Sequence, residues 1–97
     1  MKLDVSGKRV VVAGGSRGIG RSIALAFAEG GANVSICARG AETLEATRRE
    51  IAALGKIAHA ATCDLAREEA IARYIPEAVA ALGGLDVLVN NATAGPT

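Results

Sequence analysis

The feature that most constrains the fold is a glycine-rich segment, Gly14–Gly20, which separates two apolar segments of different periodicity. The run before it, Arg9–Gly14, is apolar at consecutive positions and does not alternate, which predicts a strand buried on both faces. The segment after it has apolar residues at helical spacing, which predicts a helix. The residues of this helical stripe are Ile19, Ile23, Ala26 and Phe27. The chain therefore turns from a buried strand into a helix across several glycines.

The rest of the chain repeats the alternation of strand and helix. Further strands are expected at Asn33–Ala38, Ile57–Cys63 and Asp86–Asn90, and further helices at Ala41–Leu54 and Arg67–Leu82. Pro76 lies inside the last helix and predicts a kink or break near Ile75. Helical crossovers impose parallel strand pairing with right-handed connections. The predicted fold class is α/β, a Rossmann-type three-layer sandwich with strand order 3-2-1-4, the first two helices on one face and the third on the other.

Length and composition limit the function classes. A chain of 97 residues forms at most one domain, and 51% hydrophobic residues argue against disorder. The formal net charge of +1 gives no electrostatic reason to expect nucleic acid or a membrane surface as a partner. No apolar stretch approaches the roughly 20 residues that span a bilayer, and no signal-like segment opens the chain, so we expect a cytoplasmic protein. Cys37 and Cys63 lack metal-ligand spacing and are expected to be reduced core thiols, with no metal site.

The glycine segment has the chemistry of a phosphate-binding turn. A strand that turns sharply into a helix directs free backbone N–H groups at one point, where the helix dipole adds partial positive charge. Gly14, Gly18 and Gly20 let the turn form, let a pyrophosphate approach the backbone and let the helix lie close to the sheet. The spacing G-x-x-x-G-x-G is not that of a Walker loop, which ends in Gly-Lys-Ser/Thr. A tight turn without a ligand is the alternative, but the strand before it and the helix after it favour nucleotide binding.

Two segments resemble motifs of the short-chain dehydrogenase/reductase family. Val11–Gly20 is similar to the cofactor motif T-G-x-x-x-G-I-G, and Asp86–Ala92 is similar to the segment D-x-L-V-N-N-A-G. Ala13 stands where the family has Thr, and Thr93 stands where it has the last Gly of the second motif. The resemblance extends from about Gly7 to the end of the chain. It is nearest to NADP-dependent reductases of the 3-oxoacyl-thioester type.

The resemblance implies a cofactor site at the carboxyl ends of the predicted strands. It implies that Asp64 holds the adenine amino group, that Leu65 offers its backbone there, and that Asn91 contacts the ribose region. Asp64 is equally well explained as a turn residue before the last helix. The full set of candidate cofactor-binding residues is Gly14, Ser16, Arg17, Gly18, Ile19, Gly20, Arg39, Asp64, Leu65 and Asn91.

The end of the second strand indicates which nucleotide is bound. An acid there accepts hydrogen bonds from the ribose 2′-OH of NAD, whereas a basic residue accommodates the 2′-phosphate of NADP. Here the strand ends in Ile36-Cys37-Ala38-Arg39, without a carboxylate. Arg39 offers a planar donor fork, and Arg17 in the glycine segment could reach the same phosphate. Each arginine alone is more simply a solvated surface charge, but together they favour NADP over NAD.

The catalytic residues that the resemblance implies have no counterpart here. The family uses a Tyr with a Lys four residues later, but the only tyrosine, Tyr74, is followed four residues on by Ala78. Tyr74 and His59 are therefore interpreted as packing or surface residues. The last predicted strand would also leave an apolar edge uncovered, which proteins avoid.

We therefore expect residues 1–97 to be an incomplete domain, the NADP-binding part of an oxidoreductase. The resemblance implies hydride transfer between nicotinamide and a carbonyl compound or secondary alcohol, with homo-oligomers once the missing C-terminal half is present. The chain alone is expected to be inactive. The alternative is a non-catalytic nucleotide-binding module or a partner-dependent subunit.

Overall fold

The computed structural model describes residues 4–91 and confirms the predicted alternation of strand and helix. The elements in chain order are β1 (Arg9–Ala13), α1 (Gly18–Glu29), β2 (Asn33–Ala38), α2 (Ala41–Ala53), β3 (Ala58–Thr62), α3 (Glu68–Leu82) and β4 (Val87–Asn90). Their ends lie close to the predicted ones, within the usual uncertainty of element boundaries. Thr93, which departs from the family motif, lies outside the described residues.

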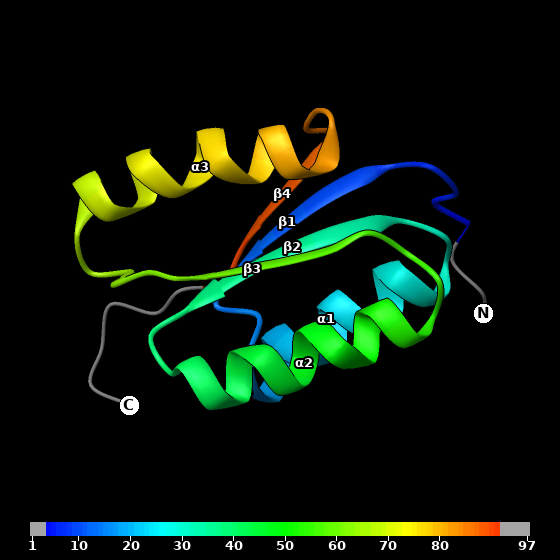
Figure 1. Cartoon of the computed structure of the whole chain (residues 1–97), viewed down its shortest axis with the longest axis horizontal. Helices are drawn as coiled ribbons and strands as arrows, with labels where there is room; N and C mark the ends of the chain where they lie inside the picture. The colour runs from blue at the N-terminus through cyan, green and yellow to red at the C-terminus, as the bar shows by residue number, and fades with distance from the viewer. Residues whose placement is uncertain (1–3, 92–97) are drawn as a thin grey trace.

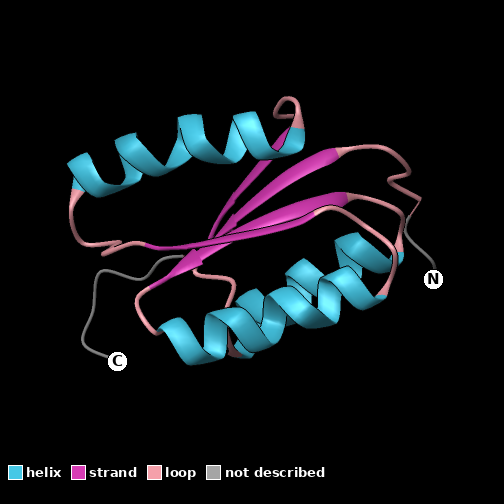
Figure 2. Ribbon diagram, viewed as in Figure 1, coloured by secondary structure: helices cyan, strands magenta, loops and turns pink. Residues whose placement is uncertain are grey.

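The four strands form one parallel sheet in the order β3-β2-β1-β4, as predicted. Helices α1 and α2 cover one face of the sheet and α3 covers the other (Figure 1). Figure 2 shows the resulting three layers, with the sheet between the two helical layers. The α/β Rossmann-type architecture is therefore confirmed. Strand β1 is central, and Val10, Val11 and Val12 are completely buried, because helices lie on both of its faces.

The face covered by α1 and α2 has an aliphatic core. Alternate residues of β1 and β2 point into it, and small residues of α1 lie against them. We call this set the aliphatic core; its buried members are Val10, Val12, Ala24, Ala28, Ala32, Val34, Ile36, Ala38, Leu44 and Ile51.

The face covered by α3 has a core of different chemistry. Its buried members, which we call the mixed core, are Val11, Ala13, Cys37, Cys63, Tyr74, Ala78 and Leu82. Between α3 and the sheet, the Tyr74 hydroxyl hydrogen-bonds the Ser35 hydroxyl, and Ser35 Oγ lies 2.7 Å from His59 Nδ1. His59 Nε2 lies 2.9 Å from a Glu77 carboxylate oxygen.

The direction of one of these contacts follows from the groups involved. A carboxylate only accepts, so His59 Nε2 donates to Glu77. Ser35 lies between the other two members and hydrogen-bonds both His59 and Tyr74. The interpretation of Tyr74 and His59 as packing residues thus omitted a polar network that ties α3 to β2 and β3.

The predicted inward stripe of α1 is wrong in part. Ile19 is 73% exposed and Ala26 is also exposed, whereas the buried residues are Gly20, Ala24 and Ala28. The small residues face the sheet because α1 lies very close to it, leaving no room there for large side chains. Ile23 and Phe27 are partly buried at the border of the aliphatic core.

Pro76 does not break α3, which runs without interruption from Glu68 to Leu82. Both Pro76 and Ala72, whose carbonyl loses its helical N–H partner, lie on the exposed side of the helix. Water can solvate that carbonyl, while Tyr74 and Ala78 keep the opposite side packed on the sheet. The predicted break is therefore absent.

An arginine–aspartate pair joins the start of β1 to the segment that enters β4. Arg9 Nε lies 2.9 Å from Asp86 Oδ2, which also accepts the Arg9 backbone N–H at 2.8 Å. Arg9 Nη1 donates to the Gly83 carbonyl at 2.8 Å, where α3 ends. In β4 itself, Leu88 faces the α3 side of the sheet and is 55% exposed, as expected for an uncovered edge.

Candidate nucleotide-binding site

The Gly14–Gly20 turn leaves β1 at the carboxyl end of the sheet and is fixed by backbone bonds to β2. The Gly14 N–H donates to the Cys37 carbonyl at 2.8 Å. A Cβ on Gly15 would lie 2.6 Å from Ile36 Cγ2, so this position has no space for a side chain. Gly14 has φ 87° and Gly18 has φ 61°, a backbone conformation that favours glycine. The predicted roles of glycine in forming the turn thus have a geometric basis.

Gly20 is the position where the turn and α1 approach each other most closely. A Cβ there would lie 1.9 Å from the Gly14 carbonyl oxygen and 2.8 Å from Asn91 Nδ2. Asn91 follows β4 and reaches the same carbonyl, with Nδ2 3.4 Å from Gly14 O, while its backbone N–H donates to Ala13 O at 2.9 Å. Asn91 therefore lies beside the turn and supports it.

Thr47 of α2 holds the other side of the turn. Its hydroxyl donates to the Ser16 carbonyl at 2.9 Å, and both residues are buried. Thr47 is not among the residues predicted from the sequence to form the site. A signal was present, because Thr47 lies in helical phase with the apolar residues Leu44 and Ile51 and so places a hydroxyl on the buried face.

The N-terminus of α1 is open to an anionic group. Arg17 is the N-cap residue in an extended conformation, its side chain makes no capping hydrogen bond, and the first turn of the helix contains no acidic residue. The first backbone N–H groups of a helix have no partner within it, and together with the dipole they favour a negative charge. At Gly18 a Cβ would meet nothing within 4 Å, so the outer side of the turn is accessible.

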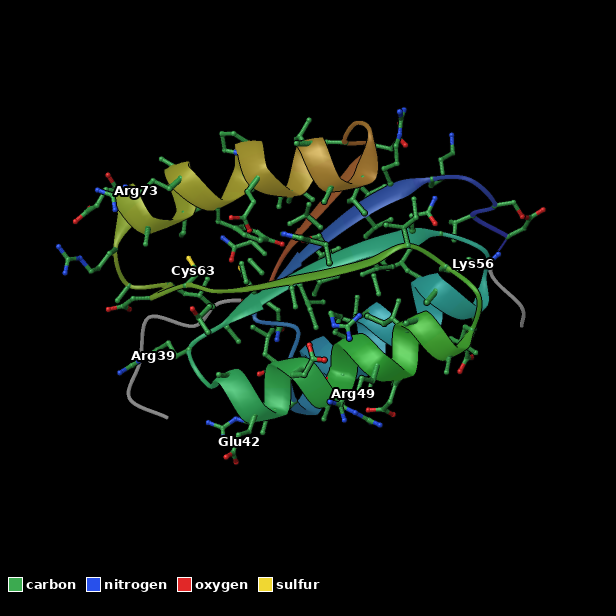
Figure 3. All side chains as sticks on the ribbon, viewed as in Figure 1. Arg39, Glu42, Arg49, Lys56, Cys63 and Arg73 are labelled. Atoms are coloured by element: carbon green, nitrogen blue, oxygen red, sulfur yellow. The ribbon has the colours of Figure 1, made fainter. Side chains whose placement is uncertain are left out.

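Arg17 and Arg39 carry positive charge near this turn. Within the described part of the chain neither arginine forms an ion pair, in contrast to Arg9, Arg21 and Arg48. Arg39 follows the last residue of β2, at the same end of the sheet as the turn, and Figure 3 shows its side chain extending away from the ribbon. No carboxylate accompanies it at the strand end, as the sequence indicated.

Asp64 and Leu65 lie in the connection from β3 to α3. Asp64 Oδ1 accepts the Ala66 N–H at 3.0 Å, and the Asp64 carbonyl accepts the Arg67 N–H at 3.0 Å. This geometry is that of a turn before a helix, which was one of the two interpretations left open. Leu65 is partly buried against the mixed core. Ile19 sits in the first turn of α1, where its backbone belongs to the candidate site and its side chain is exposed.

Two other features lie outside this site. A hollow of about 790 Å³ lies at the opposite, amino end of the sheet, and its lining includes Glu29, Gly31, Leu54 and Lys56. Figure 3 shows Lys56 and Arg39 at opposite ends of α2. Cys37 is fully buried in the mixed core, and burial raises the pKa of its thiol to about 12, which makes it inert.

Metal and membrane sites receive no support from the described residues. Within residues 4–91, no group of His, Cys, Asp and Glu side chains is arranged to hold a metal ion. None of the helices in that part of the chain is long and apolar enough to cross a bilayer.

Comparison with known proteins decides the family. The family model for short chain dehydrogenase matches residues 8–97, which is nearly the whole chain. The chain belongs to the short-chain dehydrogenase family. Its similarity to curated members includes 43% identity over 88 residues to glucose 1-dehydrogenase of Gluconobacter oxydans, covering 90% of this chain and 33% of that protein. Identity to the 3-oxoacyl-(acyl-carrier-protein) reductase FabG of Staphylococcus aureus is 46% over 86 residues, covering 88% and 35%.

Solved structures of short-chain dehydrogenases have the same fold as this chain. A short chain dehydrogenase from Burkholderia cenocepacia in complex with NADP aligns with a TM-score of 0.87 at 44% identity, covering 95% of this chain and 37% of that one. L-sorbose reductase from Gluconobacter frateurii, complexed with NADPH and L-sorbose, aligns with a TM-score of 0.88 at 34% identity, covering 99% and 37%. This short-chain dehydrogenase segment thus spans about a third of the length of the relatives it matches.

Proposed function

We propose that this chain is the NADP(H)-binding part of an oxidoreductase. The observation that carries the proposal is the meeting of three features at one end of the sheet. These are a helix N-terminus beside the glycine turn whose N-cap side chain makes no capping bond, two arginines that form no ion pair with the other described residues, and a β2 end without a carboxylate. A dinucleotide with a 2′-phosphate has the complementary charges for all three. Support also comes from relatives solved with NADP and NADPH.

The residues of the turn would bind the pyrophosphate through backbone N–H groups. Gly14, Gly18 and Gly20 leave space for that approach, and Ser16 lies between them. Arg17 and Arg39 would hold the 2′-phosphate. Asn91 would face the ribose region of the cofactor, and the Asp64–Leu65 turn would face the adenine.

The reaction that we propose is hydride transfer between the cofactor and a carbonyl compound or secondary alcohol. When bound, NADP(H) supplies or accepts the hydride. Support for this substrate class comes from relatives named as a glucose dehydrogenase and a 3-oxoacyl reductase. We further propose a cytoplasmic protein that forms homo-oligomers once the missing C-terminal half is present, and the reduced, buried thiols Cys37 and Cys63 fit that compartment.

The 97 residues alone are proposed to bind the cofactor without catalysing the reaction. Tyr74 is 4% exposed, it is hydrogen-bonded to Ser35, and Ala78 occupies the position four residues later. A tyrosine that acts as acid or base needs contact with substrate and a neighbouring cation to tune its pKa. Here burial instead raises the pKa of Tyr74. This observation favours a binding role for the segment.

Calorimetric titration with NADPH and NADH tests the proposal. The wild-type chain is expected to bind NADPH about tenfold more tightly than NADH, because only NADPH carries the charge that Arg17 and Arg39 complement. Arg39→Asp should remove that preference. Lys56→Asp makes the same charge reversal at the other end of α2 and should leave it intact. Equal affinities in the wild type, or an unchanged preference in Arg39→Asp, would show the proposal to be wrong.

A further inference from the structure

Thr47 forms the one side-chain hydrogen bond between α2 and the glycine turn that the described residues contain. Its Oγ1 lies 2.9 Å from the Ser16 carbonyl oxygen and 3.1 Å from the Thr43 carbonyl oxygen. Thr47 is 1% exposed and Ser16 is 8% exposed, so water does not replace this bond.

The Thr47 hydroxyl has a single proton and two carbonyls within reach. A threonine in a helix commonly donates to the carbonyl four residues earlier, which here belongs to Thr43. The shorter distance is to Ser16, outside the helix. The hydroxyl therefore joins α2 to the glycine turn in addition to lying within hydrogen-bond distance of a carbonyl of its own helix.

Each of the two parts that it joins lies next in sequence to one arginine of the candidate site. Ser16 directly precedes Arg17. Helix α2 begins at Ala41, two residues after Arg39. The bond between Thr47 and Ser16 therefore fixes the backbone beside Arg17 relative to the helix that follows Arg39.

We infer that Thr47 is a positioning residue that sets the preference for a 2′-phosphate. It holds Arg17 and Arg39 at a separation that lets both guanidinium groups reach one phosphate. This inference rests on the proposed function. A nucleotide without a 2′-phosphate uses the helix N-terminus but has no group for the arginines, so it depends much less on their separation.

The test uses two small nucleotides that differ only in this phosphate, adenosine 2′,5′-bisphosphate and 5′-AMP. Their affinities are measured by calorimetry for the wild-type chain, Thr47→Val, Thr47→Ser and Ser35→Ala. Valine has the shape of threonine without the hydroxyl, and serine keeps the hydroxyl. Ser35→Ala is the matched control, because it removes a fully buried hydroxyl from the opposite face of the sheet.

The quantity compared is the ratio of the two affinities. Partial unfolding lowers both affinities by the same factor and cancels from this ratio. Thr47→Val is expected to lower the preference for the bisphosphate about fivefold, the equivalent of one hydrogen bond. Thr47→Ser and Ser35→Ala should keep the wild-type ratio. Thr47→Ala, which also lacks the hydroxyl, provides the same comparison should the valine variant fail to fold.

The outcomes separate this inference from the proposed function. If the wild-type chain does not prefer the bisphosphate, the proposed function is wrong and the inference with it. If the wild type does prefer it and the variants without the hydroxyl keep that preference, only the inference is wrong. An equal loss in Ser35→Ala would also overturn it, because the effect would then come from general loosening of the fold.

Discussion

The two faces of the sheet use different chemistry to hold their helices. On the α1 and α2 face the core is aliphatic, and the buried polar residues Ser16 and Thr47 lie where α2 meets the glycine turn. On the α3 face, Ser35, His59 and Tyr74 form a hydrogen-bonded network beside two thiols. The glycine turn of the candidate site adjoins α1 and α2, and the polar network of the second face lies under α3.

The difference shows that polar character is a poor guide to function in this molecule. The network on the α3 face contains the residue types of a nucleophilic site, yet Ser35 is fully buried and cannot meet a substrate. The glycine turn contains few reactive side chains but exposes backbone N–H groups and positive charge. We therefore expect changes on the α3 face to alter stability and changes at the turn to alter binding.

The largest effect is expected from Gly20→Ala. The new Cβ would lie 1.9 Å from the Gly14 carbonyl oxygen, so the turn or α1 must move. Such overpacking should cost about 3 kcal/mol and weaken NADPH binding by more than about tenfold. Urea unfolding and calorimetry measure the two effects. Ser22→Ala, on the exposed side of the same helix, is the control and should change neither. Normal NADPH affinity in Gly20→Ala would show that the turn does not form the site.

A pair of neighbouring residues on β2 compares the two cores directly. Ile36 points into the aliphatic core and Cys37 into the mixed core, and both are fully buried. Ile36→Ala should lower the free energy of unfolding by about 3 kcal/mol, and Cys37→Ala, which removes one atom, by about 1 kcal/mol. Urea unfolding at neutral pH provides the measurement. A greater loss of stability in Cys37→Ala than in Ile36→Ala would mean that the mixed core stabilises the fold more than the size of the removed side chain suggests.

Tyr74→Phe tests whether the network of the α3 face contributes only to stability and not to NADPH binding. The change removes the hydroxyl that hydrogen-bonds Ser35 and leaves the ring in place. The free energy of unfolding should fall by about 1 kcal/mol, while NADPH affinity stays within twofold of the wild type. A loss of NADPH affinity of about tenfold would contradict the separation of the two faces.

The smallest effect is expected from the exposed ion pair between Arg9 and Asp86, which belongs to neither core. Arg9 lowers the pKa of Asp86 from 3.8 to about 2. Because the folded-state pKa is the lower one, this contribution to stability is complete above about pH 4 and is lost as the pH falls toward 2. Asp86→Asn should reduce the dependence of urea stability on pH in that range. Curves for wild type and variant that run parallel from pH 6 to 2.5 would exclude this role for Asp86.

The sequence was sufficient for the architecture because its signals are local. The continuous Val10–Val12 run, the glycine spacing and the helical crossovers together determine a parallel sheet and its order. The errors arose where tertiary packing decides. Ile19 was expected on the stripe of α1, but the close approach at Gly20 turns that helix so that small residues face the sheet.

The candidate site was predictable in its backbone and less so in its supporting contacts. The glycines and Arg39 could be identified from position and chemistry. The bond from Thr47 to Ser16 spans two elements, and no motif marks it. The same holds for the network of Ser35, His59 and Tyr74, whose members come from two strands and a helix. Contacts of this kind follow from the register between elements, which the sequence pattern does not specify.

We expect the nucleotide to bind at the glycine turn and not in the hollow at the other end of the sheet. Amide chemical shifts in a ¹⁵N-labelled chain, followed during titration with NADPH, test it directly. The expected result is a set of large shifts at Gly14–Gly20, Arg39 and Asn91, with little change at Glu29–Gly31 and Lys56. Large shifts confined to Glu29–Gly31 and Lys56 would place the nucleotide in the hollow and contradict binding at the glycine turn.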